Sequence, residues 1–177
     1  MLKQVRRIVT TNDENGKSGV LIDGIATNII AVMTELWITD GKRPNHADGI
    51  DHAQLSRKLE PPHGGTVFRF VQIAPESRYA HLTPEERRMA AAERFAAIRG
   101  AHLQPDTSRH PAMHRTQTTD YIVLLSGQIT LVLDKEERDL KPFDVVVQRA
   151  TNHAWVNRGT EDALLMAVLV DDEPAEG

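Results

Sequence analysis

Apolar residues in the second half of the chain come in short runs that are separated by turn residues. The runs are Tyr121 to Leu125, Ile129 to Leu133, Val145 to Val147 and Ala163 to Val170. Ser126-Gly127 and the charged stretch from Lys135 to Arg138 lie at turns between them. Short strands at intervals of about ten residues indicate an antiparallel sandwich or barrel.

The first half of the chain has weaker patterns. Thr66 to Ile73 is a strand by composition. Residues 1–65 are expected to form an irregular extension with short strands, such as Val5 to Thr10 and Val20 to Ile22 on either side of the Asn15-Gly16 turn signal. A barrel core is expected over residues 66–170, followed by a tail over residues 171–177.

One helix is predicted, at about residues 83–99. Thr83 with Glu86 three residues later forms a capping box, and Pro84 suits the first turn. Gly100 is the expected C′ residue. Ala91, Phe95 and Ile98 share one face, so the helix is expected to lie against the domain, either as a packed cover or dimer element or as a lid over the barrel mouth. The segment from Glu85 to Arg88 is interpreted as a solvated face.

Composition excludes several classes of protein. A chain of 177 residues suits a single domain. It has no cysteine, which excludes disulfides, thiolate zinc sites and a cysteine nucleophile. A net charge of −4 without a basic patch argues against nucleic acid. No apolar run approaches the ~18 residues of a membrane span, so we expect no membrane partner and a cytoplasmic protein.

The candidate chemistry lies in two polar clusters, each containing a histidine beside a strand. Side chains alternate between the two faces of a strand, so His114, Thr116 and Asp120 share one face. His153, Trp155 and Asn157 share a face in the second cluster. If both sets point inward, they form a polar group with apolar walls, which is typical of a small-ligand pocket.

The two clusters resemble the two sequence motifs of the cupin superfamily. His114, Asp120 and Gly127 match the first motif, although Thr116 stands where the family usually has a second metal-binding histidine. The second motif is matched by Pro142, Asp144, His153 and Asn157, with Phe143 and Ala150 in the places of its two glycines. The resemblance covers residues 110–170, and the chain is similar to small single-domain cupins.

This resemblance implies an all-β fold, namely a cupin-type antiparallel β-barrel (double-stranded β-helix or jelly roll) with one inserted α-helix. It also implies a homodimer and a metal ion near the centre of the barrel. The ligands would be His114, Asp120 and His153, a facial triad that suits divalent Fe, Mn, Ni or Zn, and His110 is a candidate fourth ligand. The alternatives are that Asp120 braces a strand and that the histidines are core residues.

The barrel is also expected to bind a small molecule. The residues predicted to contact that molecule are Trp155, Gln148, Arg115, Thr116, Phe70 and Asn157. Trp155 is either a pocket wall or core packing, and one of Arg69 and Phe70 must face the pocket. The preferred function is a metal-dependent cupin enzyme that acts on a small aromatic or unsaturated organic substrate as an oxygenase, isomerase, dehydratase or decarboxylase. The alternative is a non-catalytic small-molecule-binding cupin with a degenerate metal site.

Overall fold

The computed structural model describes residues 1–42, 46, 48–55 and 58–172. Within these residues the regular structure is mainly β-strand, with one α-helix, α1 (Pro84–Ala97). Three short 3₁₀ turns cover His52–Gln54, Glu76–Tyr79 and Ala101–Leu103. The strands are β1 (Arg6–Asn12), β2 (Ser18–Ile25), β3 (Ile29–Ile30), β4 (Met33–Thr39), β5 (Thr66–Ile73), β6 (Thr118–Ser126), β7 (Ile129–Leu133), β8 (Glu137–Leu140), β9 (Val145–Arg149), β10 (His153–Val156) and β11 (Ala163–Asp171).

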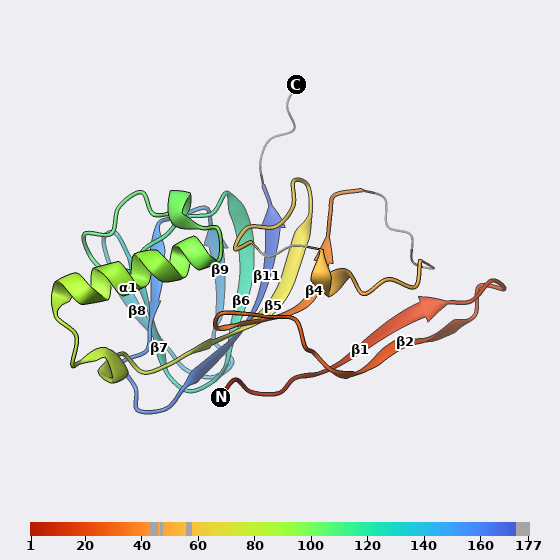
Figure 1. Cartoon of the computed structure of the whole chain (residues 1–177), viewed down its shortest axis with the longest axis horizontal. Coiled ribbons are helices and arrows are strands. Elements are labelled where there is room, and N and C mark those ends of the chain that lie inside the picture. Colours follow the sequence, from red (N-terminus) through yellow and green to blue (C-terminus); the bar gives the residue numbers. More distant parts are fainter. Residues whose placement is uncertain (43–45, 47, 56–57, 173–177) are drawn as a thin grey trace, which may run out of the picture.

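Two antiparallel sheets enclose the core. The larger has six strands in the order β3-β4-β5-β11-β6-β9, and the smaller has three in the order β10-β7-β8 (Figure 1). Apolar side chains from both sheets form one cluster, with Ile122, Leu124 and Leu165 from the larger sheet and Leu131 and Leu140 from the smaller. The all-β architecture with one inserted helix is therefore confirmed.

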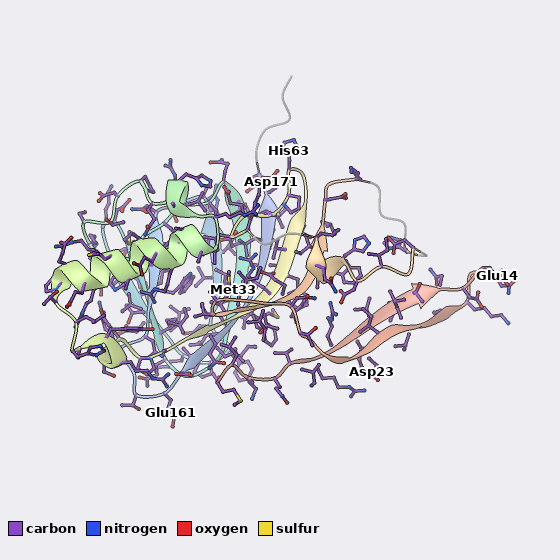
Figure 2. The ribbon with its side chains drawn as sticks, viewed as in Figure 1. Glu14, Asp23, Met33, His63, Glu161 and Asp171 are labelled. Carbon is purple, nitrogen blue, oxygen red and sulfur yellow. The ribbon has the colours of Figure 1, made fainter. Side chains whose placement is uncertain are left out.

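The N-terminal extension is more regular than expected. Strands β1 and β2 form a hairpin whose turn, from Asp13 to Lys17, is closed by backbone hydrogen bonds. Gly16 has a φ of 74° in this turn, and Glu14 lies at the projecting tip (Figure 2). Strand β4 pairs with β5, so part of residues 1–65 belongs to the main sheet.

Helix α1 begins as predicted. The Thr83 side chain accepts a hydrogen bond from the backbone N–H of Glu86, and the Glu86 carboxylate accepts one from the N–H of Thr83. Its buried face carries Ala91, Phe95 and Ile98. The expected C′ residue was wrong by one position, because Arg99 has the left-handed φ of 55°. A Cβ at Gly100 would lie 3.3 Å from the Phe95 ring, so packing is what favours glycine there.

The C-terminal strand extends one residue further than expected. Asp171 ends β11, and its carboxylate accepts a hydrogen bond from the N–H of Gly64. His63 lies 3.4 Å from the same carboxylate, at the upper edge of the view in Figure 2. Of the predicted tail, residues 173–177 lie outside the described residues. The part of the chain that the structure describes has no helix long and apolar enough to span a membrane. The homodimer stays a prediction.

Candidate metal and ligand site

A cavity of about 610 Å³ lies between α1 and the inner faces of the strands. Its walls are largely apolar and include Ile122, Leu165 and Leu169 from the large sheet. Helix α1 supplies a further wall through Phe95 and Ile98, so the helix covers the site. This volume is typical of pockets for small organic molecules, which range over about 300–1,000 Å³.

The two motif histidines meet in this cavity. The backbones of His114 and His153 form a β-bridge, with reciprocal N–H to O distances of 2.8 and 2.9 Å. Both side chains line the cavity, and their ring centroids lie 4.3 Å apart. The prediction that they point into one interior and approach each other is confirmed.

Hydrogen bonds define the tautomer of both rings. Nδ1 of His114 lies 3.0 Å from the carbonyl oxygen of Ala112, and Nδ1 of His153 lies 2.9 Å from that of Thr151. A carbonyl oxygen only accepts, so each Nδ1 carries the proton and each Nε2 keeps a lone pair. Burial lowers the pKa of both, that of His153 to about 3 with a further contribution from His114. Both imidazoles are therefore neutral at pH 7.

Asp120 lines the same cavity from β6. It is 4% exposed, and its Oδ1 has no hydrogen-bond partner among the described residues. Burial raises the pKa of this carboxyl to about 6, although a hydrogen bond from Thr118 and the charge of Arg69 act in the opposite direction. Within the described residues, no three His, Asp or Glu side chains come together closely enough to hold one ion. Asp120 as a third ligand stays a prediction.

Arg69, and not Phe70, faces the cavity. Arg69 is fully buried and pairs with Glu35 from β4, with Nε 3.3 Å from Oε2 and Nη2 3.1 Å from Oε1. Its other N–H groups point to the carbonyls of Leu59 and Lys58 and to a methionine sulfur. The prediction that Phe70 lines the pocket is wrong, because Phe70 lies with Phe68 on the other face of β5, beside residues of β1 and β4. An arginine with all its donors engaged can face an apolar interior.

Trp155 is both a pocket wall and a core contact. Its indole lines the cavity and meets His153 edge to face, with ring centroids 5.8 Å apart. It also packs against the main apolar cluster. Flat unsaturated ligands would find an aromatic surface directly beside the histidines.

Replacing Trp155 with alanine is expected to weaken binding of N-phenyl-1-naphthylamine by about tenfold, because a stacking partner is lost. The fluorescence of this probe, titrated with protein, measures its affinity. Trp37→Ala is the matched control, since Trp37 stacks on His52 outside the cavity. Unchanged affinity in a Trp155→Ala protein that keeps its fold would leave the indole a core residue only.

Four predicted ligand contacts take other roles. Asn157 lines the cavity, but its amide is engaged by Ile73, Glu161 and Gly159, so it braces a turn. The other three residues do not line the cavity: Thr116 bonds to Thr118 at 2.6 Å, Gln148 donates to Thr151, and Arg115 is exposed.

His110 lines the cavity but is poorly suited to bind a metal. Its Nδ1 accepts a hydrogen bond from the N–H of Ala112, so that lone pair is used. Its Nε2 lies 3.4 Å from a carboxylate oxygen of Glu76. Burial lowers the pKa of this histidine, although the charge and hydrogen bond of Glu76 act in the opposite direction.

The arginines of α1 were missed as site residues. Arg87, Arg88 and Arg94 line the cavity. The prediction of a solvated face holds for Glu85, Glu86 and Arg88, which are exposed, while Arg87 is half-buried. The available signal was spacing, because Arg87 and Arg94 lie seven residues apart on the stripe that also carries Ala91.

Two positions of the second motif keep the backbone of the glycines they replace. Phe143 has a φ of 74° and Ala150 a φ of 45°. Residues with a side chain rarely adopt a positive φ, whereas glycine does so freely. The turns that lead into β9 and out of it therefore have a backbone that glycine would adopt without strain.

These features define a class of protein: a small β-fold that presents paired histidines inside an apolar cavity. Residues 101–169 match the family model of the cupin domain. The cupin-domain-containing oxidoreductase fogC of Aspergillus ruber is 43% identical over 182 residues, which cover 96% of this chain and 74% of that protein. The chain therefore belongs to the cupin superfamily.

Two other similarities are more limited. The phomopsin biosynthesis cluster protein C′ of Diaporthe leptostromiformis is 50% identical over 66 residues, which cover 36% of this chain and 35% of that protein. The chain thus matches about a third of the length of that relative. A Cupin 2 conserved barrel domain protein from Salinispora arenicola CNS-205 has a solved structure with 18% identity, a TM-score of 0.37, and coverage of 60% of this chain and 64% of that chain.

Proposed function

We propose that this chain is a metal-dependent oxidoreductase that acts on a small, largely apolar, aromatic or unsaturated molecule in the cavity beneath α1. One observation carries the proposal. His114 and His153 lie side by side, each with its Nδ1–H engaged by a backbone carbonyl and its Nε2 lone pair available. The Aspergillus ruber relative is named as an oxidoreductase, which supports the oxidoreductase class.

The chemistry of the donor set fits a divalent cation. Two neutral imidazoles and an unpartnered, buried carboxylate oxygen line one cavity, and all three accept rather than donate. The nearest buried cation, Arg69, has its N–H groups engaged elsewhere. Imidazole and carboxylate ligands suit Fe, Mn, Ni and Zn, and the backbone bonds at Nδ1 orient the rings as metal ligands usually require.

When bound, such an ion would supply Lewis-acid or redox chemistry at coordination positions left open to the substrate. The chain's own residues have separate tasks. His114 and His153 would hold the ion, and Trp155 would orient a flat ring beside it. Asp120 would accept a proton or a hydrogen bond from the substrate at its free Oδ1. Helix α1, through Phe95 over His114 at 5.0 Å between ring centroids, would keep water away.

Metal titration tests this proposal. Calorimetry of the metal-free protein with Fe(II), Mn(II), Ni(II) and Zn(II) is expected to give one ion per chain. His114→Ala and His153→Ala should each weaken that binding by at least about tenfold, since each removes a ligand. The matched control is His102→Ala, because His102 is exposed and pairs with Glu60 away from the cavity.

A second function is favoured by Thr116, which occupies the position of the usual second histidine and is engaged by Thr118. A site with weakened metal affinity would leave a small-molecule-binding cupin without redox chemistry. Absence of binding for all four ions, together with retained binding of N-phenyl-1-naphthylamine, would reject the metal-dependent enzyme in favour of this binder.

A further inference from the structure

Polar residues line several parts of the cavity, among them Glu76, which lies near Arg87 and His110. The acceptor end holds His114, His153 and Asp120, and none of these offers a free donor. The side formed by α1 carries three arginines, Arg87, Arg88 and Arg94. Apolar side chains from α1 and the sheets line the space as well. A ligand that matches the whole cavity therefore has an apolar body and a negatively charged group directed toward α1.

Arg94 differs from the other arginines that line the cavity. Arg69 pairs with Glu35, and Arg88 lies 2.7 Å from Glu85. Arg87 lies 3.8 Å from Glu76. Among the described residues, no carboxylate lies within ion-pair distance of Arg94.

Arg94 is exposed to solvent, and two contacts orient its guanidinium. Its Nε donates to the carbonyl of Ala90 at 3.2 Å, and its Cζ lies 5.3 Å from the centre of the Tyr79 ring. Both Nη groups are left without a hydrogen-bond partner among the described residues. A stacked, planar guanidinium with two free edge donors is pre-organised to bind a carboxylate or sulfonate in a bidentate manner.

We propose that Arg94 anchors an anionic group of the ligand, so that the site selects amphipathic organic anions over neutral molecules of the same shape. This inference rests on the proposed function, because it concerns the substrate of the same cavity. Arg87 adds positive charge on the same helix face, one heptad away. The positive side of the cavity contrasts with the net charge of −4 of the whole chain, which makes the attraction local.

Two probes that share one ring system test the proposal. 8-Anilinonaphthalene-1-sulfonate carries a sulfonate, and N-phenyl-1-naphthylamine does not. The wild-type protein should bind the anionic probe more tightly, and the neutral probe should displace it. Arg94→Gln should weaken binding of the anionic probe about five- to tenfold, because hydrogen bonds between charged groups are lost. Its affinity for the neutral probe should be unchanged. Arg94→Lys should restore part of the affinity.

Two control variants separate this site from general effects. Lys135→Gln removes the same charge from the exposed β7–β8 turn and should change neither affinity. Tyr121→Ser removes an aromatic ring, 51% exposed, from the outside of the sheet and should also leave both probes unchanged. Raising the salt concentration from about 0.05 to about 0.5 M should weaken binding of the anionic probe to the wild type. The same change should have a much smaller effect on its binding to Arg94→Gln.

The outcomes are distinct. If Arg94→Gln binds both probes as the wild type does, the anion site is wrong while the apolar cavity stands. If the neutral probe does not bind the wild type, the apolar-ligand part of the proposed function fails as well. The metal titration is independent of both results, because neither probe replaces a metal ligand.

Discussion

Replacing Glu35 with alanine is expected to destabilise the fold by about 3–5 kcal/mol, the usual cost of removing one partner of a buried ion pair. Glu35 is 1% exposed, and its partner Arg69 is equally buried. Burial raises the pKa of Glu35, while the charge of Arg69 opposes that rise. Without the carboxylate, a guanidinium would remain in a buried interior with only neutral hydrogen-bond partners. That loss is a large part of the free energy of unfolding of a typical domain, which is about 5–15 kcal/mol.

Urea unfolding of Glu35→Ala measures this cost. The double variant Glu35→Leu/Arg69→Met should recover most of the lost stability, because apolar residues of similar volume avoid the desolvation of two charges. Asp23→Ala is the control: its ion pair with Arg6 is exposed, so its loss should leave the stability nearly unchanged. A Glu35→Ala protein within about 1 kcal/mol of the wild type would mean that water reaches Arg69.

The same ion pair links the fold to the site. Arg69 donates to the carbonyls of Lys58 and Leu59, and Leu59 lines the cavity. Glu35 therefore positions a segment that is far from the histidines in sequence but forms part of the same wall. We expect Glu35→Ala to weaken binding of the neutral probe even under conditions where the variant stays folded.

Local sequence signals predicted local structure well. The capping box of Thr83 and Glu86 defined the start of α1, and Asn15-Gly16 marked a hairpin turn. Strand parity, together with the cupin motifs, predicted that His114 and His153 would meet. For the helix start and the hairpin turn, the information lies within a few residues of the feature, whereas the meeting of the two histidines needed the family motifs as well.

Predictions that depend on tertiary context were less accurate. Arg69 and Phe70 occupy opposite faces of β5, and either residue type can be buried when its partners are present. Only the position of Glu35 on the neighbouring strand decides that Arg69 faces inward. Asn157 was expected to contact ligand, yet its amide is engaged by backbone groups as distant in sequence as Ile73. The role of α1 as a cavity wall likewise required its packing.

Replacing Asp120 with asparagine is expected to stabilise the metal-free protein at neutral pH by up to about 3 kcal/mol. The folded chain raises the pKa of this carboxyl from 3.8 to about 6, and one pKa unit corresponds to about 1.4 kcal/mol. Between these two pH values the folded state binds more protons than the unfolded state. The wild type should therefore lose stability as the pH rises from about 4 to about 6. Asparagine carries no charge, so the variant should not show this loss.

Unfolding in urea at several pH values, with chelator present, measures the difference. The stability gain of Asp120→Asn should be largest above pH 6 and should shrink toward pH 4, where the wild-type carboxyl is protonated. Glu161→Gln, at an exposed acid, should show no such trend. A variant that is less stable than the wild type at every pH would indicate that the ionised carboxylate is paired in solution.

The same variant, titrated with metal, separates the two roles of Asp120. A loss of about tenfold or more in metal affinity would make Asp120 the third ligand, because a carboxylate supplies both charge and geometry. Unchanged affinity would leave its free oxygen to the substrate.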